Sequence, residues 1–262
     1  MDDIRPCREL LFLLPVSGIV AIVVRWMSAV HRIQEIGGTS AYHGVYEDGY
    51  RLLNSTAVKH ALNLERESPA IRDRYGRNEY GESFLTARRL IEAGVRLVTV
   101  NWMFITPRAK VYNVWDAHGG LMDLDQGATG YGMLKANYCL PPFDQAFAAL
   151  LEDLSLSGML DETLVACIGE FGRTPQINKV NGRDHWPFCY SGVLAGGGVR
   201  GGTVYGVSDK QAAYAKENPV TPGDYLATIC QACGLDSQRE VHDLEGRPFS
   251  ICDGQPISAI LP

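Results

Sequence analysis

The sequence predicts an α/β fold in which a mainly parallel central sheet is flanked by helices. Two successions of helix and strand predict it. Residues 81–93 place apolar side chains three and four positions apart, as in a helix with one buried face, and the β-branched run 95–100 follows. A second amphipathic stretch leads to the continuously apolar run 164–168, which is typical of a buried strand of a parallel sheet. Helices that alternate with apolar strands indicate layers of helices around one sheet.

The chain begins with a segment that is unlike the rest. Residues 10–24 are uncharged and largely apolar, but Pro15 and Gly18 interrupt them, and they are shorter than the roughly 20 residues of a membrane-spanning helix. A secretory signal fits poorly, because acidic residues balance the basic ones before this run. Three interpretations of residues 1–40 stay open: a degenerate signal or anchor, an added packing helix, or a start foreign to the domain. Residues 41–262 are expected to form one α/β domain.

Local signals place the elements of this domain. Proline suits the first turn of a helix, glycine commonly follows its last turn, and a capping box marks its start. In chain order these signals predict a helix at 58–64, a short helix after Ser68-Pro69, the helix 81–93 ended by Gly94, the strand 95–100, a helix from Pro141 to Gly158, strands at 161–168 and 190–195, and a helix at 225–233 capped by Thr221 and Asp224 and ended by Gly234.

Composition limits the classes of function. With 262 residues, of which 46% are hydrophobic and 21% charged, the chain can bury one large core. The formal net charge of -6 argues against a nucleic-acid partner, since such proteins normally carry a basic face. The seven cysteines are scattered through a chain too large to need a disulfide framework, so reduced thiols are expected.

Residues able to bind metals and anions follow the apolar run 164–168. Glu170, Arg173, Asp184 and His185 come after it, and in open α/β sheets ligands bind outside the carboxyl ends of the strands. Upstream, Asp116 and His118 are two residues apart, so in an extended segment both side chains point the same way. The dense set of potential ligands is therefore Asp116, His118, Glu170, Asp184 and His185.

Two imidazoles with carboxylates suit Zn²⁺, Mn²⁺ or iron better than Ca²⁺ or Mg²⁺, which prefer oxygen ligands alone. The alternative is that His118 and His185 are hydrogen-bonded loop residues beside two tryptophans. Arg173 suits the bidentate binding of a phosphate or sulfate group. The alternative role of Arg173 is a structural ion pair with Glu170 or Asp184.

Other motifs favour structural roles. Cys230 and Cys233 form a CxxC on a predicted helix without further ligands, so core packing is expected rather than a redox or metal role. The glycine-rich run 196–202 lacks the GK[ST] of a phosphate-binding loop and predicts a tight turn. The remaining histidines, His31, His43, His60 and His242, are expected on the surface.

Several uncommon strings resemble a known bacterial family. They are GESFLTARRLIEAGVRLVTVNW, WDAHG, LLEDLSLSGMLDETLVACIGEFGRTPQIN, GRDHWPFCYSGVLAGGGVRGGTVYG and GRPF, and together they resemble domain of unknown function family 1501. The likeness covers about residues 50–261. It implies the alkaline phosphatase-like superfamily, which includes sulfatases, with a corresponding α/β fold and an exported or periplasmic location.

The resemblance also implies roles for individual residues. Asp116, His118 and His185 look like the three ligands of one metal, and Glu170 stands where a second-metal aspartate is usual. Phe171 occupies a position that is normally a histidine ligand. WDAHGGLM departs from the family's WDTHGDNF-like string, which alters the expected rim of the pocket. The first-strand aspartate and the Ser or Thr nucleophile of the superfamily have no counterpart here, so the chain resembles a C-terminal portion.

Three functions are compatible with these residues. The first is a metal-dependent hydrolase-type domain that acts on a small phosphate or sulfate ester, with Glu170 and Arg173 assisting catalysis. The second is a truncated, catalytically silent domain with a binding or structural role, since a complete enzyme needs an activated hydroxyl nucleophile. The third, a 2-His-1-carboxylate iron oxygenase, fits less well, because helices alternate here with strands.

Overall fold

The computed structural model describes residues 19–25, 47, 49–51, 54–101, 104–105, 111–112, 115–119, 131–243 and 245–262. The three interpretations of residues 1–40 therefore concern residues that mostly lie outside the described part. Only 19–25 of that segment are described, and they form a strand of the main sheet.

The main sheet has four strands in the order β2-β1-β5-β8. These are β2 (Leu97–Asn101), β1 (Ile19–Arg25), β5 (Thr163–Gly169) and β8 (Val193–Gly196). Every neighbouring pair is antiparallel. The expected mainly parallel sheet is therefore wrong. Because β1 runs opposite to both of its neighbours, β2 and β5 point the same way but are separated by β1.

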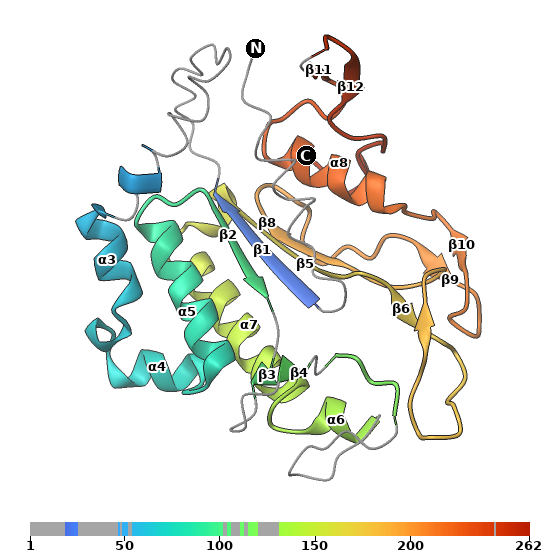
Figure 1. Ribbon diagram of the computed structural model, residues 1–262, viewed down its shortest axis with the longest axis horizontal. Helices are drawn as coiled ribbons and strands as arrows, with labels where there is room; N and C mark the ends of the chain where they lie inside the picture. Colours follow the sequence, from blue (N-terminus) through green and yellow to red (C-terminus); the bar gives the residue numbers. More distant parts are fainter. Residues whose placement is uncertain are drawn as a thin grey trace.

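Burial on both faces explains why the apolar run of β5 suggested a parallel strand. Val165 packs into the core formed with helices α5 (Glu79–Glu92) and α7 (Leu140–Leu156), whereas Leu164 packs on the other face against α8 (Pro222–Ala232). Figure 1 shows α5 and α7 on one side of the sheet and α8 on the other. A strand covered on both faces is continuously apolar whichever way its neighbours run. The apolar run 164–168 therefore indicated that the strand is buried, but it did not indicate the direction of the neighbouring strands.

The predicted helices are confirmed within one to three residues at most ends. Besides α5, α7 and α8, the described helices include α3 (Thr56–Leu62), α4 (Pro69–Tyr75), α6 (Tyr131–Lys135) and the 3₁₀ turns η1 (Leu64–Arg66) and η2 (Leu160–Glu162). The Ser68 hydroxyl accepts a hydrogen bond from the Ile71 N–H at the start of α4. Thr221 and Asp224 form the expected capping box of α8.

Short two-stranded ladders complete the described strands. They are β3 (Phe104–Ile105) with β4 (Val111–Tyr112), β6 (Gly172–Arg173) with β7 (His185–Trp186), β9 (Val207–Ser208) with β10 (Ala215–Glu217), and β11 (Glu240–His242) with β12 (Pro248–Ser250). All four ladders are antiparallel. The β6–β7 hairpin matters most, because it carries two of the residues singled out from the sequence.

An ion-pair network fastens the helices on the α5 side of the sheet. Asp153 of α7, whose side chain is 9% exposed, pairs with Arg74 of α4. Its Oδ2 atom also lies 3.5 Å from Nη1 of Arg88 in α5. The Tyr75 hydroxyl donates to the same carboxylate at 2.9 Å. Arg88 and Arg89 both pair with Glu67, which precedes α4. Three helices are thus linked through two carboxylates that are largely shielded from water.

The motifs assigned structural roles agree with the structure. Cys230 and Cys233 are buried, with Cys230 inside α8 and Cys233 at its end. Gly196, Gly197, Gly198 and Gly202 all have positive φ, as the tight turn requires. His60 and His242 are exposed, while His31 and His43 lie outside the described residues.

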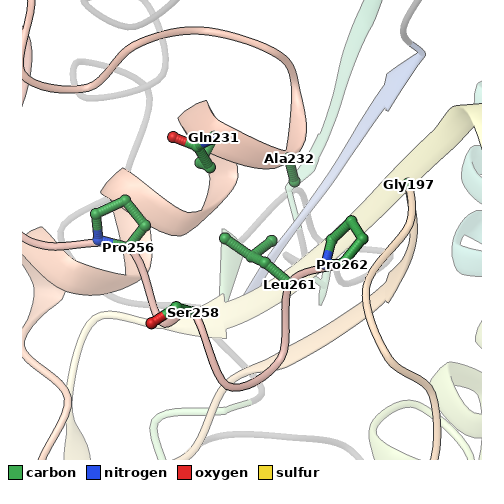
Figure 2. A pocket seen from close by; sticks show the side chains of 7 residues that line it. All are labelled: Gly197, Gln231, Ala232, Pro256, Ser258, Leu261 and Pro262. Carbon is green, nitrogen blue, oxygen red and sulfur yellow. The ribbon is translucent and has the colours of Figure 1, made fainter.

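A cavity of about 470 Å³ lies between the end of α8, the turn at Gly197 and the C-terminal segment (Figure 2). Its lining includes Gln231, Ser258 and Leu261 but none of the predicted ligands. Within the described part of the chain, no helix combines the length and apolar character needed to span a bilayer.

Candidate metal site

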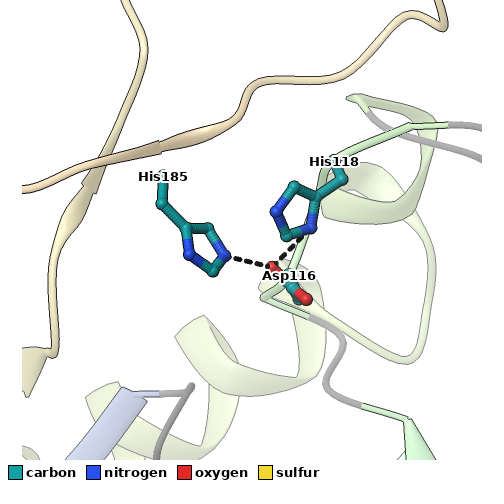
Figure 3. Close-up of side chains that lie close together, drawn as sticks. All are labelled: Asp116, His118 and His185. Carbon is teal, nitrogen blue, oxygen red and sulfur yellow. Dashed lines mark hydrogen bonds and ion pairs between the residues drawn. The ribbon is translucent and has the colours of Figure 1, made fainter.

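Three side chains with metal-binding atoms meet at one place, although they come from two segments 69 residues apart. Asp116 and His118 lie in the segment 115–119, and His185 opens strand β7. Asp116 Oδ1 lies 2.8 Å from His118 Nδ1 and 3.1 Å from His185 Nε2 (Figure 3). The two imidazole centroids are 4.4 Å apart. One ligand atom from each residue therefore faces a common point, and all three side chains remain partly exposed.

A tight turn brings Asp116 and His118 together, and not the extended segment that the sequence suggested. The His118 N–H donates to the Asp116 carbonyl oxygen at 2.9 Å, which closes a three-residue γ-turn. Residues 116–119 belong to no strand or helix. The predicted convergence is present, but the alternation of side chains along a strand does not produce it.

Close backbone packing locks this turn against the loop between β6 and β7. A Cβ atom added to Gly182 would lie 1.9 Å from the carbonyl carbon and oxygen of His118. A Cβ atom added to Gly119, whose φ is +84°, would lie 2.2 Å from a carbonyl oxygen of that loop. The Arg183 N–H donates to the Ala117 carbonyl at 3.0 Å. The two segments touch through their main chains, so the position of His118 depends on the loop.

Arg173 binds the cluster directly. Its Nη2 donates to Asp116 Oδ1 at 2.6 Å and to the Trp115 carbonyl at 2.8 Å. The ion pair considered for Arg173 therefore forms with Asp116, and the proposed pairing with Glu170 or Asp184 is wrong. Arg173 belongs to strand β6, which pairs with the strand carrying His185, so one hairpin supplies both groups.

The charge of Asp116 is stabilised by its neighbours. Burial on its own would raise the pKa of this carboxyl. Hydrogen bonds from Arg173 and His185, with the positive charge of Arg173, outweigh burial and hold the pKa below its usual range. Asp116 is therefore an anion at neutral pH, which is the form that binds a cation.

Two other rings lie close to the imidazole of His185. Its centroid is 4.1 Å from the centre of the Phe171 ring and 4.4 Å from that of the His118 ring. Phe171 stands where the family resemblance implies a histidine ligand, and its phenyl ring offers no donor atom to a metal. The ring does restrict the orientation of His185.

Two predicted ligands are not part of the described cluster. Glu170 directly follows β5 and is exposed, and its carboxylate is absent from the group of converging ligand atoms. Asp184 Oδ1 accepts a hydrogen bond from the Asn178 side chain at 3.0 Å, which orients it within the hairpin loop. Asp116, His118 and His185 are thus the three candidates that the geometry brings together.

The donor set and its spacing fit a divalent cation. A tetrahedral zinc ion with ligand bonds of about 2.0–2.1 Å separates its ligand atoms by roughly 3.3 Å. The distances from Asp116 Oδ1 to the two imidazole nitrogens, 2.8 and 3.1 Å, are close to that value, and all three ligand atoms lie within 4.8 Å of one another. Two nitrogens and one carboxylate oxygen also leave coordination positions open for water or substrate.

Asn178 is a site-supporting residue that the sequence reasoning missed. Its side chain donates to the His118 carbonyl at 2.7 Å. The local signal was the Asn181-Gly182 dipeptide, which marks a turn in the same loop. A turn signal does not reveal which distant segment the loop will contact.

The family model described as "Protein of unknown function (DUF1501)" matches residues 24–261. No curated protein and no solved structure matches the chain.

Proposed function

Because the chain belongs to the DUF1501 family, for which the matching description gives no activity, we propose a function from the site: Asp116, His118 and His185 hold one divalent cation. Zinc or manganese suits two imidazoles and a carboxylate better than magnesium or calcium does. The observation that carries the proposal is the approach of both imidazole nitrogens to the same carboxylate oxygen across 69 residues of sequence.

We further propose that the substrate is a small phosphate or sulfate ester and that the domain is of the metal-dependent hydrolase type. A bound divalent cation would polarise the ester and lower the pKa of a bound water to about 7. The side chains present carry one negative charge on Asp116 and one positive charge on Arg173. A divalent cation would leave the site with net positive charge, which favours an anionic substrate. The choice of a phosphate or sulfate ester also rests on the resemblance to alkaline phosphatase-like and sulfatase-like proteins.

The side chains of this chain have distinct roles in this proposal. Asp116 supplies the anionic ligand, and the two imidazoles complete three coordination positions. Arg173 already donates to Asp116, and its Nη1 contact with the Arg183 carbonyl is longer, at 3.3 Å. An anion at the mouth of the site could therefore recruit this second nitrogen. Glu170 is proposed to orient water or to contribute to a second cation site from its exposed position after β5.

A catalytically silent binding domain is the second candidate, and one observation favours it. In the described ranges, no serine or threonine hydroxyl is hydrogen-bonded to Asp116, His118 or His185. The hydroxyl of Thr174, which directly follows Arg173, donates to the Gln176 carbonyl and accepts from the Asp184 N–H. A hydrolase that forms a covalent intermediate needs an activated hydroxyl.

Elemental analysis combined with turnover assays separates these candidates. The purified chain is measured for bound zinc and manganese and then assayed with aryl phosphate and aryl sulfate. One metal ion per chain with turnover of either ester supports the hydrolase. One metal ion without turnover supports the silent domain. The absence of bound metal after exposure to both ions refutes the metal site itself.

A further inference from the structure

We propose that Asn178 is a positioning residue that holds His118 in the orientation needed for metal binding. This inference rests on the proposed metal site and adds a residue outside the three ligands. Asn178 lies in the loop between β6 and β7, whereas His118 lies 60 residues earlier in the chain. Asn178 is not one of the three proposed ligands, so any effect of its side chain on metal binding must act through His118.

The amide of Asn178 uses its full hydrogen-bonding capacity between the two segments. Its nitrogen donates to the His118 carbonyl at 2.7 Å and to Asp184 Oδ1 at 3.0 Å. Its oxygen accepts from the N–H groups of Val180 at 3.1 Å and Gly182 at 2.9 Å. An amide offers two donor hydrogens and two acceptor lone pairs, and all four are used here. The oxygen shapes the loop, and the nitrogen reaches across to His118.

Backbone contact makes His118 sensitive to this loop. Gly182, whose N–H binds the Asn178 oxygen, packs so closely on His118 that there is no room for a Cβ atom. The peptide of His118 is also fixed through its N–H by the Asp116 carbonyl. A shift of the 178–182 loop would therefore move the His118 peptide and turn its Nδ1 away from Asp116. Groups behind metal ligands typically contribute about 10- to 100-fold to metal affinity.

The substitution Asn178→Asp separates the two functions of the amide. The new carboxylate would keep an oxygen that accepts from the N–H groups of Val180 and Gly182. It would lose both donor hydrogens of the amide, which bind the His118 carbonyl and the Asp184 carboxylate. The substitution would also place a carboxylate against the His118 carbonyl and against the Asp184 carboxylate. The additional change Asp184→Asn supplies a donor to the new carboxylate and removes the repulsion within the loop. The double variant thus restores the bond within the hairpin but not the bond to His118.

The experiment compares the wild-type chain with N178D, D184N and N178D/D184N. Zinc affinity is measured by competition with a chelator, the ligand geometry by the visible spectrum of the cobalt(II)-loaded chain, and apo stability by thermal unfolding. N178D is expected to bind zinc about 10- to 100-fold more weakly, with an altered cobalt spectrum. The double variant is expected to regain apo stability while zinc affinity stays low.

Two results overturn the proposal. One is wild-type zinc affinity in N178D. The other is recovery of zinc affinity together with stability in the double variant, which would show that Asn178 serves the hairpin alone. If N178D fails to fold, the double variant, which lacks the carboxylate repulsion, provides the same comparison with wild type. Failure of the wild-type chain to bind zinc or cobalt refutes the proposed metal site, which distinguishes that failure from the failure of the Asn178 proposal.

Discussion

The substitution Asp116→Asn removes the anionic ligand while keeping the shape of the side chain. Asp116 Oδ1 lies close to both imidazole nitrogens and to the Arg173 guanidinium. The neutral amide is a poor metal ligand, and its nitrogen would face positive or donor groups if the amide were flipped. We expect zinc affinity to fall by about 100-fold or more, beyond the 10- to 100-fold effect of groups behind a ligand.

The effect can be expressed as a shift in thermal stability. At a zinc concentration 100 times the wild-type dissociation constant, binding stabilises the folded chain by about 2.7 kcal/mol. An unfolding entropy of about 2.1 cal/mol/K per residue converts this to a rise of roughly 5 °C in Tm for a chain of this length. With affinity reduced 100-fold, the same zinc concentration adds only about 0.4 kcal/mol, or less than about 1 °C.

Differential scanning fluorimetry with and without zinc measures this difference. The Tm of each variant without metal is the reference, because loss of the Asp116–Arg173 pair also lowers apo stability by about 1–2 kcal/mol. Asp161→Asn, an exposed carboxylate in η2, serves as the matched control and is expected to keep the wild-type zinc shift. A zinc-induced rise of about 5 °C in D116N would refute the role of Asp116.

Three further predictions follow from other carboxylates. Glu170→Gln is expected to keep the zinc-induced rise in Tm, because Glu170 is outside the cluster. If the variant showed no such rise, Glu170 would have to be counted among the metal ligands. Asp153→Ala is expected to lower the free energy of unfolding in urea by about 3 kcal/mol, because it removes the largely buried carboxylate that Arg74 and Arg88 share and the acceptor of the buried Tyr75 hydroxyl. Glu152→Ala, an exposed neighbour, should change it by less than about 1 kcal/mol. Hydrogen bonds from the Gln255 and Thr221 N–H groups lower the pKa of Asp224 in the folded chain. The ionised Asp224 therefore stabilises the fold fully at a pH above the ordinary aspartate pKa, and this stabilisation is lost as the pH falls through the lowered pKa of the folded chain. Urea midpoints at pH 6 and pH 3 should therefore differ less in Asp224→Asn than in wild type, and an equal difference would contradict the assignment.

Local signals in the sequence identified the helices well, because those signals act within one or two turns. Ser68 and Thr221 cap their helices as their sequence context suggests. The order and direction of the strands were not accessible in this way. Strand β1 comes from a segment set apart by its composition, and it enters between β2 and β5. Strand pairing depends on contacts distant in sequence, which an apolar run does not specify.

The candidate site shows the same division between local and distant information. The approach of Asp116, His118 and His185 was expected from their chemistry and from family resemblance. The sequence reasoning gave an incorrect local geometry, since a γ-turn and not an extended segment joins Asp116 to His118. The roles of Asn178 and Gly182 depend on a contact across 60 residues or more, so no local pattern predicted them.

The most direct test of the central claim is an anomalous-diffraction map of zinc-soaked crystals, recorded at the zinc absorption edge. The account predicts one strong peak about 2.0–2.2 Å from Asp116 Oδ1, His118 Nδ1 and His185 Nε2. A peak bound elsewhere, or no peak among these three atoms in zinc-saturated crystals, would contradict it.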